Sequence, residues 1–574
     1  MFLREVKRTN RNGSQVSYLQ LVHNEWDAAA QTSRTKILHS FGRTDQVDTD
    51  AIERLIGSLA RVLDPAAALR ATTGSELEFL DSRPLGGVDV LDGLWRRLGI
   101  DTAMTTRLAG TPRITSPFER VCFALVANRA LAPSSKLAAS DWISHDVHIA
   151  GLDEVSDDVC YRAMDWLLEV APELEREVFW AVATLLDLEV DLVFFDSTST
   201  YFETESADDP AGRNDRGEAV DPDGPDAVRL GGFRAFGHSK DHREDRPQIV
   251  IGMAVTRAGI PIRCWSWPGN TADVTMIAQV RADLRDWSLS RMVWVTDRGF
   301  ASEANRRSLQ TGGGHYIQAE RLRHPTAEAA AALARPGRYR TVAGNLRVKE
   351  VAPKAGDSVT VDRFVVCHNP EQATRDAAVR DELVAQLESL IDGSDRWSQR
   401  RRDEFVGSLK SSPGLRRFLR RDRGRGGRLR VDQSAIAAEA RLDGKWLLRC
   451  SDPKLPAEDI ARGYKQLLEV ERGWRDMKQV LDLRPVHHRR EDRIRAHVLL
   501  CWLALLLIRL AETTTSQTWP AMRRELGRLH AVTFTGPAGT YRQRTEPTKP
   551  QIDLYAQLGL TLPKKTIEIT PARP

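Results

Sequence analysis

Five strand-like segments, interrupted by two helix-like segments, constrain the fold of this chain more than any other feature. The strands are expected at 191–195, 248–256, 260–267, 291–296 and 315–319, and the helices at 271–286 and 301–309. The order along the chain is therefore β-β-β-α-β-α-β. The first strand ends at Asp196 and the fourth at Asp297.

This order is that of the ribonuclease-H-like fold, an α/β fold in which helices flank a mixed sheet. The first and fourth strands are neighbours in that fold, so that acids at their ends can share a metal site. Asp196 and Asp297 lie 297 − 196 = 101 residues apart, so only the fold can bring them together. A lone aspartate after a strand is commonly a turn or capping residue, but two on these particular strands predict a catalytic core.

A third acid is expected on a helix covering about 457–481. At 100° per residue, Tyr464, Glu471 and Lys478 lie within about 40° of one another, with Arg475 at the edge of that sector. A carboxylate, a phenol and two cations would then line one side of the helix. An alternative stays open, in which this side is a solvated face where Glu471 pairs with Arg475 four residues later.

The residue types favour a particular metal chemistry. Two divalent ions roughly 3.5–4 Å apart, held by clustered carboxylates, can activate the attacking oxygen and stabilise the leaving oxygen of a phosphodiester. The six cysteines are widely spaced and form no C-x-x-C pair, which argues against a zinc site of that kind. An all-carboxylate site indicates Mg²⁺, with Mn²⁺ as a substitute.

Three segments resemble the motif regions of DDE transposases from bacterial insertion sequences. They are FFDSTSTYF (194–202), VTDRGFAS (295–302) and YKQLLEVERGWRDMK (464–478), and they are most similar to the insertion sequence 4 superfamily, in particular its insertion sequence 1634 group. The superfamily signature Y-x2-R-x3-E-x6-K falls on Tyr464, Leu467, Glu471 and Lys478, with leucine in place of arginine. The 471 − 297 = 174 residues that separate the second and third acids leave room for the β-rich insertion of that superfamily.

The resemblance implies that Asp196, Asp297 and Glu471 are the catalytic, metal-binding acids of a transposase. Such an enzyme binds the terminal inverted repeats of its element, cleaves double-stranded DNA, and joins the 3′-hydroxyl ends to target DNA. The resemblance also implies a homodimer in the DNA complex, located at the nucleoid of a bacterial cytoplasm. Two alternatives are a domesticated, non-catalytic DNA-binding protein and a nuclease of the same fold that does not join strands.

Further residues are candidates for contact with DNA. Those expected at phosphates are Tyr464, Lys478, Arg475, Lys240, His238 and Arg298. A solvated loop is the competing interpretation for His238 and Lys240. Trp397 could stack on a flipped base, although a surface or core tryptophan is more common. The arginine-rich segment 416–430 suits phosphate contacts and is equally typical of a solvated surface.

Three other acids compete with the expected ligands. Asp241 and Asp245 precede the second strand, and Glu469 lies two residues before Glu471. Glu469 would point about 160° away from Glu471 on one helix, so the two cannot serve the same site.

The remaining sequence suggests six regions. They are an N-terminal β/α unit (1–70), a helical region for DNA-end binding or, equally, a scaffold (71–188), the first part of the core (189–320), a β-rich insertion (321–455), the closing helices (456–512) and a loosely packed C-terminal tail (513–574). The polar segment 203–232 is expected to be a mobile loop. The apolar run 498–508 is about half of a membrane span and indicates a buried helix, and the charged N-terminal segment lacks the apolar stretch of a signal peptide. We therefore expect a cytoplasmic protein without a membrane partner.

Overall fold

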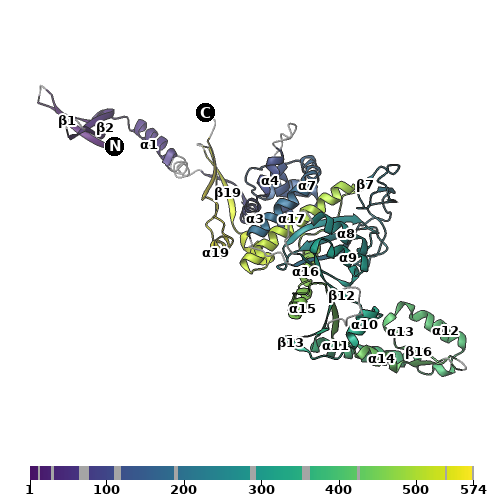
Figure 1. The fold of residues 1–574 in the computed structure, drawn as a ribbon. Helices are drawn as coiled ribbons and strands as arrows, with labels where there is room; N and C mark the ends of the chain where they lie inside the picture. Colours follow the sequence, from purple (N-terminus) through teal and green to yellow (C-terminus); the bar gives the residue numbers. More distant parts are fainter. Residues whose placement is uncertain are drawn as a thin grey trace. The chain divides into compact units, whose positions relative to one another are not determined.

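The computed structural model describes residues 1–10, 13–27, 31–63, 77–108, 118–185, 192–284, 292–351, 362–422, 424, 427–536 and 539–571. The chain divides into two compact units, whose helices and strands are labelled in Figure 1. The first consists of Met1–Gly86, Glu525–Ala556 and Thr561–Pro574, and the second of Gly87–Arg524 and Gln557–Leu560.

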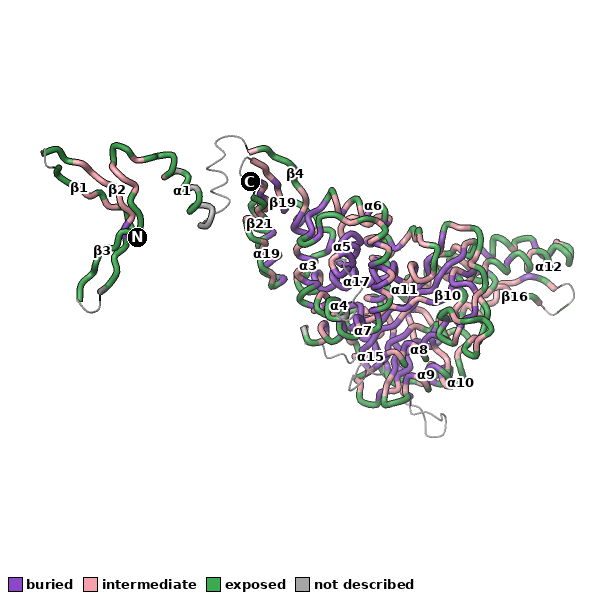
Figure 2. Tube along the Cα trace, turned by 90° about the horizontal axis from the view of Figure 1, so that it is seen from above, coloured by how far each residue is buried: buried purple, intermediate pink, exposed green. Residues whose placement is uncertain are grey.

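The first unit contains two antiparallel sheets. One has the order β1-β2-β3 (Phe2–Thr9, Gln15–Asp27, Thr32–Arg43), and its strands are largely exposed (Figure 2). Helix α1 (Thr49–Leu63) follows it in the chain. The other sheet has the order β21-β20-β19-β4 (Thr566–Pro571, Gly539–Arg544, His530–Gly536, Glu78–Pro84).

This second sheet corrects the expectation of a loosely packed C-terminal tail. Strands β19 and β20 pair along their length, and the rings of Phe534 and Tyr541 stack with centroids 5.3 Å apart. Tyr541 is buried, whereas the residues on either side of it in β20 are half-buried. A sheet with one solvated face alternates apolar and polar residues, so its overall composition is polar enough to resemble a loop.

The helical part of the second unit is built around α17 (Glu491–Thr515), which contacts α5 and α7. Its other members are α3 (Gly86–Arg97), α4 (Ile100–Leu108), α5 (Phe118–Leu131), α6 (Lys136–Asp141) and α7 (Asp157–Leu185). Among the described residues, α17 is the one helix that is long and apolar enough to cross a membrane, yet 94% of its apolar window is buried inside the protein (Figure 2). The prediction of a buried helix at 498–508 is confirmed.

A nine-stranded mixed sheet forms the other part of this unit, in the order β10-β9-β5-β11-β12-β18-β15-β14-β13. The five predicted strands are β5 (Leu192–Tyr201), β9 (Gln248–Val255), β10 (Pro261–Pro268), β11 (Val293–Thr296) and β12 (His315–Glu320). Their spatial order is third, second, first, fourth, fifth. The helices expected between them are α8 (Asp273–Leu284) and α9 (Glu303–Gln310). The first and fourth strands are parallel neighbours, as predicted.

The segment 321–455 contributes to this same sheet. It supplies β13 (Arg340–Ala343), β14 (Leu346–Val351), β15 (Arg363–His368) and β18 (Lys445–Cys450), and β18 pairs with β12. Between β15 and β18, the helices α11 (Pro370–Ile391), α12 (Gln399–Ser408), α13 (Pro413–Arg416) and α14 (Gln433–Ala440) accompany the hairpin of β16 (Leu419–Arg421) and β17 (Leu429–Val431). These helices share a small apolar cluster that includes Leu387, Leu409 and Phe418.

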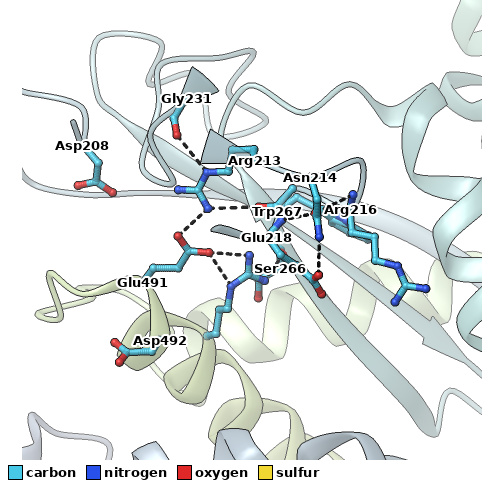
Figure 3. A network of polar contacts seen from close by, with 12 residues as sticks. Asp208, Arg213, Asn214, Arg216, Glu218, Gly231, Ser266, Trp267, Glu491 and Asp492 are labelled. Atoms are coloured by element: carbon cyan, nitrogen blue, oxygen red, sulfur yellow. Dashed lines mark hydrogen bonds and ion pairs between the residues drawn. The ribbon is translucent and has the colours of Figure 1, made fainter. Parts of the chain in front are cut away.

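The expectation of a mobile loop at 203–232 is wrong, because this segment folds into the small sheet β7-β6-β8 (Ala219–Val220, Ala211–Arg213, Arg229–Gly231). Figure 3 shows how the buried Arg213 anchors it. The Arg213 guanidinium donates to Glu491 Oε2 at 2.6 Å and to the carbonyl of Gly231 at 3.0 Å. Arg495 holds the other oxygen of Glu491 and the carbonyl of Ser266. Ion pairs to α17 thus fix a segment whose composition alone indicates a loop.

Candidate catalytic site

Asp196 and Asp297 come side by side from adjacent parallel strands. The register of β5 and β11 pairs Phe195 with Thr296, and each aspartate is the next residue. Asp196 does not end its strand as expected, since β5 continues to Tyr201 and pairs with β9 along Phe194–Tyr201. Thr198, Thr200 and Tyr201 favour strand conformation, which agrees with the longer strand. What ends at Asp196 is the pairing of β5 with β11.

The apolar core beneath the two aspartates fixes the backbone that carries them. Phe195 packs edge-on against Phe300 with ring centroids 5.3 Å apart, and both rings are buried. Phe300 closes the short 3₁₀ turn Arg298–Phe300 directly after Asp297. An anchored ring on each side therefore limits how far the two carboxylates can separate.

The surroundings of Asp196 raise its pKa and place a lysine ammonium beside it. Burial raises the pKa of Asp196 to about 6; the Lys240 ammonium acts in the opposite direction, and the nearby Asp297 and Asp273 raise the pKa further. Lys240 Nζ lies 3.8 Å from Asp196 Oδ1 and 3.7 Å from Asp273 Oδ2. It also donates to the carbonyl and hydroxyl oxygens of Ser197 at 2.6 and 2.9 Å. A cation already balances the acids at this point.

Asp273 is an acid of the site that sequence reasoning missed. It is the first residue of α8, and its Oδ1 accepts a hydrogen bond from Ser197 Oγ at 2.8 Å. A Cβ placed on Gly299 would meet its Oδ2 at 3.2 Å, so this carboxylate also lies beside the turn after Asp297. The signal available in the sequence was an acid in the first turn of a helix that follows the third strand.

The single helix expected at 457–481 is two helices, α15 (Ala457–Lys465) and α16 (Leu468–Gln479). Between them, the amide of Leu467 bonds to the carbonyl of Tyr464 at 3.1 Å, an i to i+3 contact of the 3₁₀ type, while Gln466 and Leu467 keep helical φ and ψ. The tighter turn changes the angle between Tyr464 and Glu471 from that of one regular α-helix. The corrected geometry directs Tyr464 Oη to Asp297 Oδ1, to which it donates at 2.9 Å.

The environment of Tyr464 links the second aspartate to Glu471. Burial raises the pKa of Tyr464, and the negative charges of Asp297 and Glu471 raise it further, while Arg298 opposes them. Tyr464 thus stays a neutral donor that holds one oxygen of Asp297. The charges of Asp297, Glu471 and Arg298 therefore all affect the pKa of this one phenol.

Helix α16 packs its apolar side on the sheet and leaves Glu471 exposed. Val470, Trp474 and Met477 are buried. A Cβ on Gly473 would lie 2.7 Å from Met253 Cε, so glycine allows the close approach of α16 to β9. Glu469 lies beside Gly259 in the turn between β9 and β10, on a different side of the helix from Glu471.

Lys478 and Lys240, two of the residues expected to contact phosphates, both donate hydrogen bonds to β5. Lys478 Nζ contacts Thr198 Oγ1 at 2.8 Å and Asp241 Oδ1 at 2.9 Å. Arg298 and Arg475 are exposed. The exposed His238 ring lies 3.2 Å from Glu244 Oε1.

Trp397 and the arginine-rich segment 416–430 both contact other residues of the 321–455 segment. The Trp397 ring packs edge-on against Phe405, and Arg401 lies 4.7 Å above it. In the segment 416–430, several arginines pair with acids of the same chain: Arg417 with Glu439, Arg420 with Asp422, Arg421 with Asp403, and Arg428 and Arg430 with Asp395.

The donor set fits divalent cations that prefer oxygen ligands. Asp196 and Asp297 supply adjacent carboxylates, and the Lys240 ammonium beside Asp196 shows that the site attracts positive charge. Within the described part of the chain, no group of three or more His, Cys, Asp or Glu side chains lies close enough to hold an ion together. The side chain of Glu471 must therefore approach the aspartates for three acids to bind one ion.

A cleft of about 580 Å³ adjoins Asp297 and Tyr464. Cationic side chains that line it include Arg298, Arg321 and Lys445, and its far side is formed by residues of α11 and α14. Arg380 and Arg417 also line it but are paired with Asp443 and Glu439. Acids line the cleft as well, among them Glu320, Asp376 and Asp443, so both charges are present in the lining next to Asp297.

Comparison with known proteins identifies the family. Residues 191–507, more than half of the chain, match the family model of the transposase DDE domain, and residues 3–69 match that of the IS1634 family transposase, N-terminal domain. No curated protein matches the chain. A solved cryo-EM structure of a piggyBac transposase synaptic complex with hairpin DNA is similar over 76% of this chain and 79% of that one, at 12% identity and a TM-score of 0.31, which is too low to carry an argument. On the family matches, the chain belongs to the IS1634-like DDE transposases, enzymes that cleave and transpose DNA with the help of divalent metal ions.

Proposed function

We propose that Asp196, Asp297 and Glu471 are the metal-binding acids of this transposase, within a ribonuclease-H-like core. The observation that carries the proposal is the parallel pairing of β5 with β11, which brings two aspartates 101 residues apart in the chain to adjacent positions. The strand order β10-β9-β5-β11-β12 supports the fold assignment. Glu471 is supported by its charge acting on Tyr464, which itself binds Asp297.

The carboxylate ligands favour Mg²⁺, with Mn²⁺ as a substitute. When bound, these ions would supply Lewis-acid activation of the attacking oxygen and stabilisation of the leaving oxygen. The chain's own residues orient the reactants. Tyr464 holds Asp297 through its hydroxyl, and Phe300 anchors the turn behind that aspartate.

The phosphate-contacting residues surround the acids. Arg298 lies beside Tyr464 in the cleft, and Lys240 and Lys478 lie next to β5. Their ammonium and guanidinium groups would hold the phosphates that flank the reacting one. Water attacks in the cleavage step and the freed 3′-hydroxyl attacks target DNA in the joining step, so no covalent protein–DNA intermediate is needed.

The DNA partners in this proposal are the terminal inverted repeats of the element and a target duplex. A homodimer would hold two ends at once, because joining both ends of one element requires two active sites. The proposed location is the nucleoid of a bacterial cytoplasm, where both DNA partners are found.

The test combines three isosteric variants with a matched control. Asp196→Asn, Asp297→Asn and Glu471→Gln should each abolish cleavage of an end-repeat duplex and retain the shift of that duplex in a gel. Glu469→Gln removes the same charge two residues from Glu471 and should retain most activity. Full cleavage by one of the three variants would show that the substituted acid is not required for catalysis. Precleaved ends distinguish a transposase, which joins them to target DNA, from a nuclease, which does not.

A further inference from the structure

We propose that Asp241 is a positioning residue that fixes the Glu471 helix against the strand of Asp196. The inference rests on the proposed assignment of Asp196 and Glu471 as ligands. It is based on the contacts of the short segment 239–241.

Asp241 connects to the end of the Glu471 helix through two cations. Its Oδ1 lies 2.9 Å from Lys478 Nζ, and its Oδ2 lies 3.1 Å from Arg484 NH1. Lys478 lies in the last turn of α16, and Arg484 follows that helix in the chain. The side chains of Asp241 and Lys478 are only 16% and 14% exposed, so this ion pair is screened much less than a surface pair.

The same segment is bound to β5 on its other side. The backbone amide of Lys240 donates to Ser199 Oγ at 2.9 Å, and Lys240 Nζ donates to the carbonyl of Ser197 at 2.6 Å. Lys478 adds a direct bond to Thr198 Oγ1. Three consecutive residues of β5 after Asp196 therefore contact the segment 239–241 or its partner on α16.

These contacts set the distance between two of the proposed ligands. Asp196 lies immediately before the bonded stretch of β5, and Glu471 lies seven residues, or two helical turns, before Lys478 on α16. Buried apolar residues hold the helix on the sheet, and the bonds of Asp241 add directional, charged contacts at the C-terminal end of that helix. Because these contacts fix the position of α16 along β5, they also fix the position of Glu471 relative to Asp196.

The experiment compares Asp241→Asn with Asp245→Asn in the full chain. Asp245 lies four residues away, is exposed, and pairs with Arg243, so the control removes the same charge without touching α16. Backbone amide exchange of α16 should accelerate by about tenfold in Asp241→Asn, since its bonds to two charged side chains are weakened. Exchange in β5 and α17 should stay unchanged, as should exchange in the control.

A second readout is Mn²⁺ affinity, measured on the DNA-free protein from the electron paramagnetic resonance signal of free Mn²⁺. Removing a residue that orients a ligand typically weakens metal affinity by about 10- to 100-fold, and we expect a change of that size in Asp241→Asn. Asp241→Glu keeps the charge and should recover part of the affinity. Unchanged α16 exchange in Asp241→Asn would overturn the inference.

The two proposals fail in different ways. If Glu471→Gln leaves the Mn²⁺ affinity unchanged, the assignment of Glu471 as a ligand is wrong. Exchange of the α16 amides in Asp241→Asn still decides whether Asp241 fixes the helix, because that measurement needs no metal.

Discussion

The raised pKa of Asp196 predicts that removing its charge stabilises the metal-free protein in a pH-dependent way. The pKa is about 6 in the folded protein and 3.8 in the reference state, chiefly because the half-buried carboxylate loses contact with water. Below pH 3.8 the carboxyl is protonated in both states and costs nothing. Stability falls as the pH rises through this window, and above pH 6 the cost levels off at about 3 kcal/mol, from 1.36 kcal/mol per pKa unit.

Asp196→Asn should therefore raise the free energy of unfolding by about 3 kcal/mol at pH 7.5 and by about half of that at pH 5. Guanidinium unfolding in the presence of a chelator measures this, with tryptophan fluorescence as the signal. Trp265 and Trp267 report on the relevant core, since they pack in the same apolar cluster as Phe195. Asp245→Asn is the matched control and should not stabilise the protein, because Asp245 is an exposed partner of Arg243.

The same carboxyl must lose its proton to bind a cation, so metal affinity should fall below pH 6 in the wild-type protein. A gain in stability that is equal at pH 5 and pH 7.5 would refute a buried, charged Asp196 as its cause. No gain at either pH would show that Lys240 already compensates the buried charge in full.

Three further predictions concern the cation, the tyrosine and the arginine-rich segment. Chelation should abolish cleavage, Mg²⁺ or Mn²⁺ should restore it, and Ca²⁺ should support DNA binding with little cutting; cleavage that persists in excess chelator would contradict a metal mechanism. Tyr464→Phe should weaken Mn²⁺ binding as well as cleavage, because it removes the hydroxyl that orients Asp297; an unchanged Mn²⁺ titration would assign Tyr464 to DNA contact alone. Neutralising arginines in 416–430 should reduce the slope of log K for DNA binding against log salt by about 0.9 for each DNA phosphate that the protein no longer neutralises. An unchanged slope would show that these arginines form intrachain ion pairs and do not contact DNA.

The sequence predicted the central strands well because each is a short apolar run with clear boundaries. Such runs bury both faces of the sheet, as the paired residues of β5 and β11 do. The family resemblance then located the acids. The pairing of Asp196 with Asp297 needed only the strand order, so it could be predicted without side-chain detail.

Other features depend on contacts between distant segments and could not be read from local composition. Arg213 folds the 203–232 segment through Glu491, which lies 278 residues away. The C-terminal strands form because β19 pairs with β4 at the other end of the chain. Asp273 enters the site through Ser197, 76 residues before it. In each case the local sequence is polar and typical of a solvated loop or a helix cap. Only the distant partner determines the structure that forms.

The contact of Tyr464 with Asp297 differs from the role that one continuous helix predicts for this signature residue. On one continuous helix, Tyr464 would lie about 10.5 Å along the axis from Glu471 and would be suited to a flanking phosphate. In the structure the Tyr464 hydroxyl instead donates to Asp297, one of the proposed ligands. Leu467, which stands where the superfamily signature has arginine, is itself 7% exposed and packs in the core.

An arginine at position 467 would therefore have to bury its stem in that core and extend its charged end out of it. The exposed Arg298 needs no such path, because it already lies beside Tyr464 and lines the cleft next to Asp297. We therefore expect Arg298 to supply the phosphate contact that the signature arginine would make. Arg298→Ala should weaken cleavage more than Arg475→Ala, since Arg475 is exposed on α16 and does not line the cleft. Equal effects of the two substitutions on the cleavage rate would contradict this reasoning.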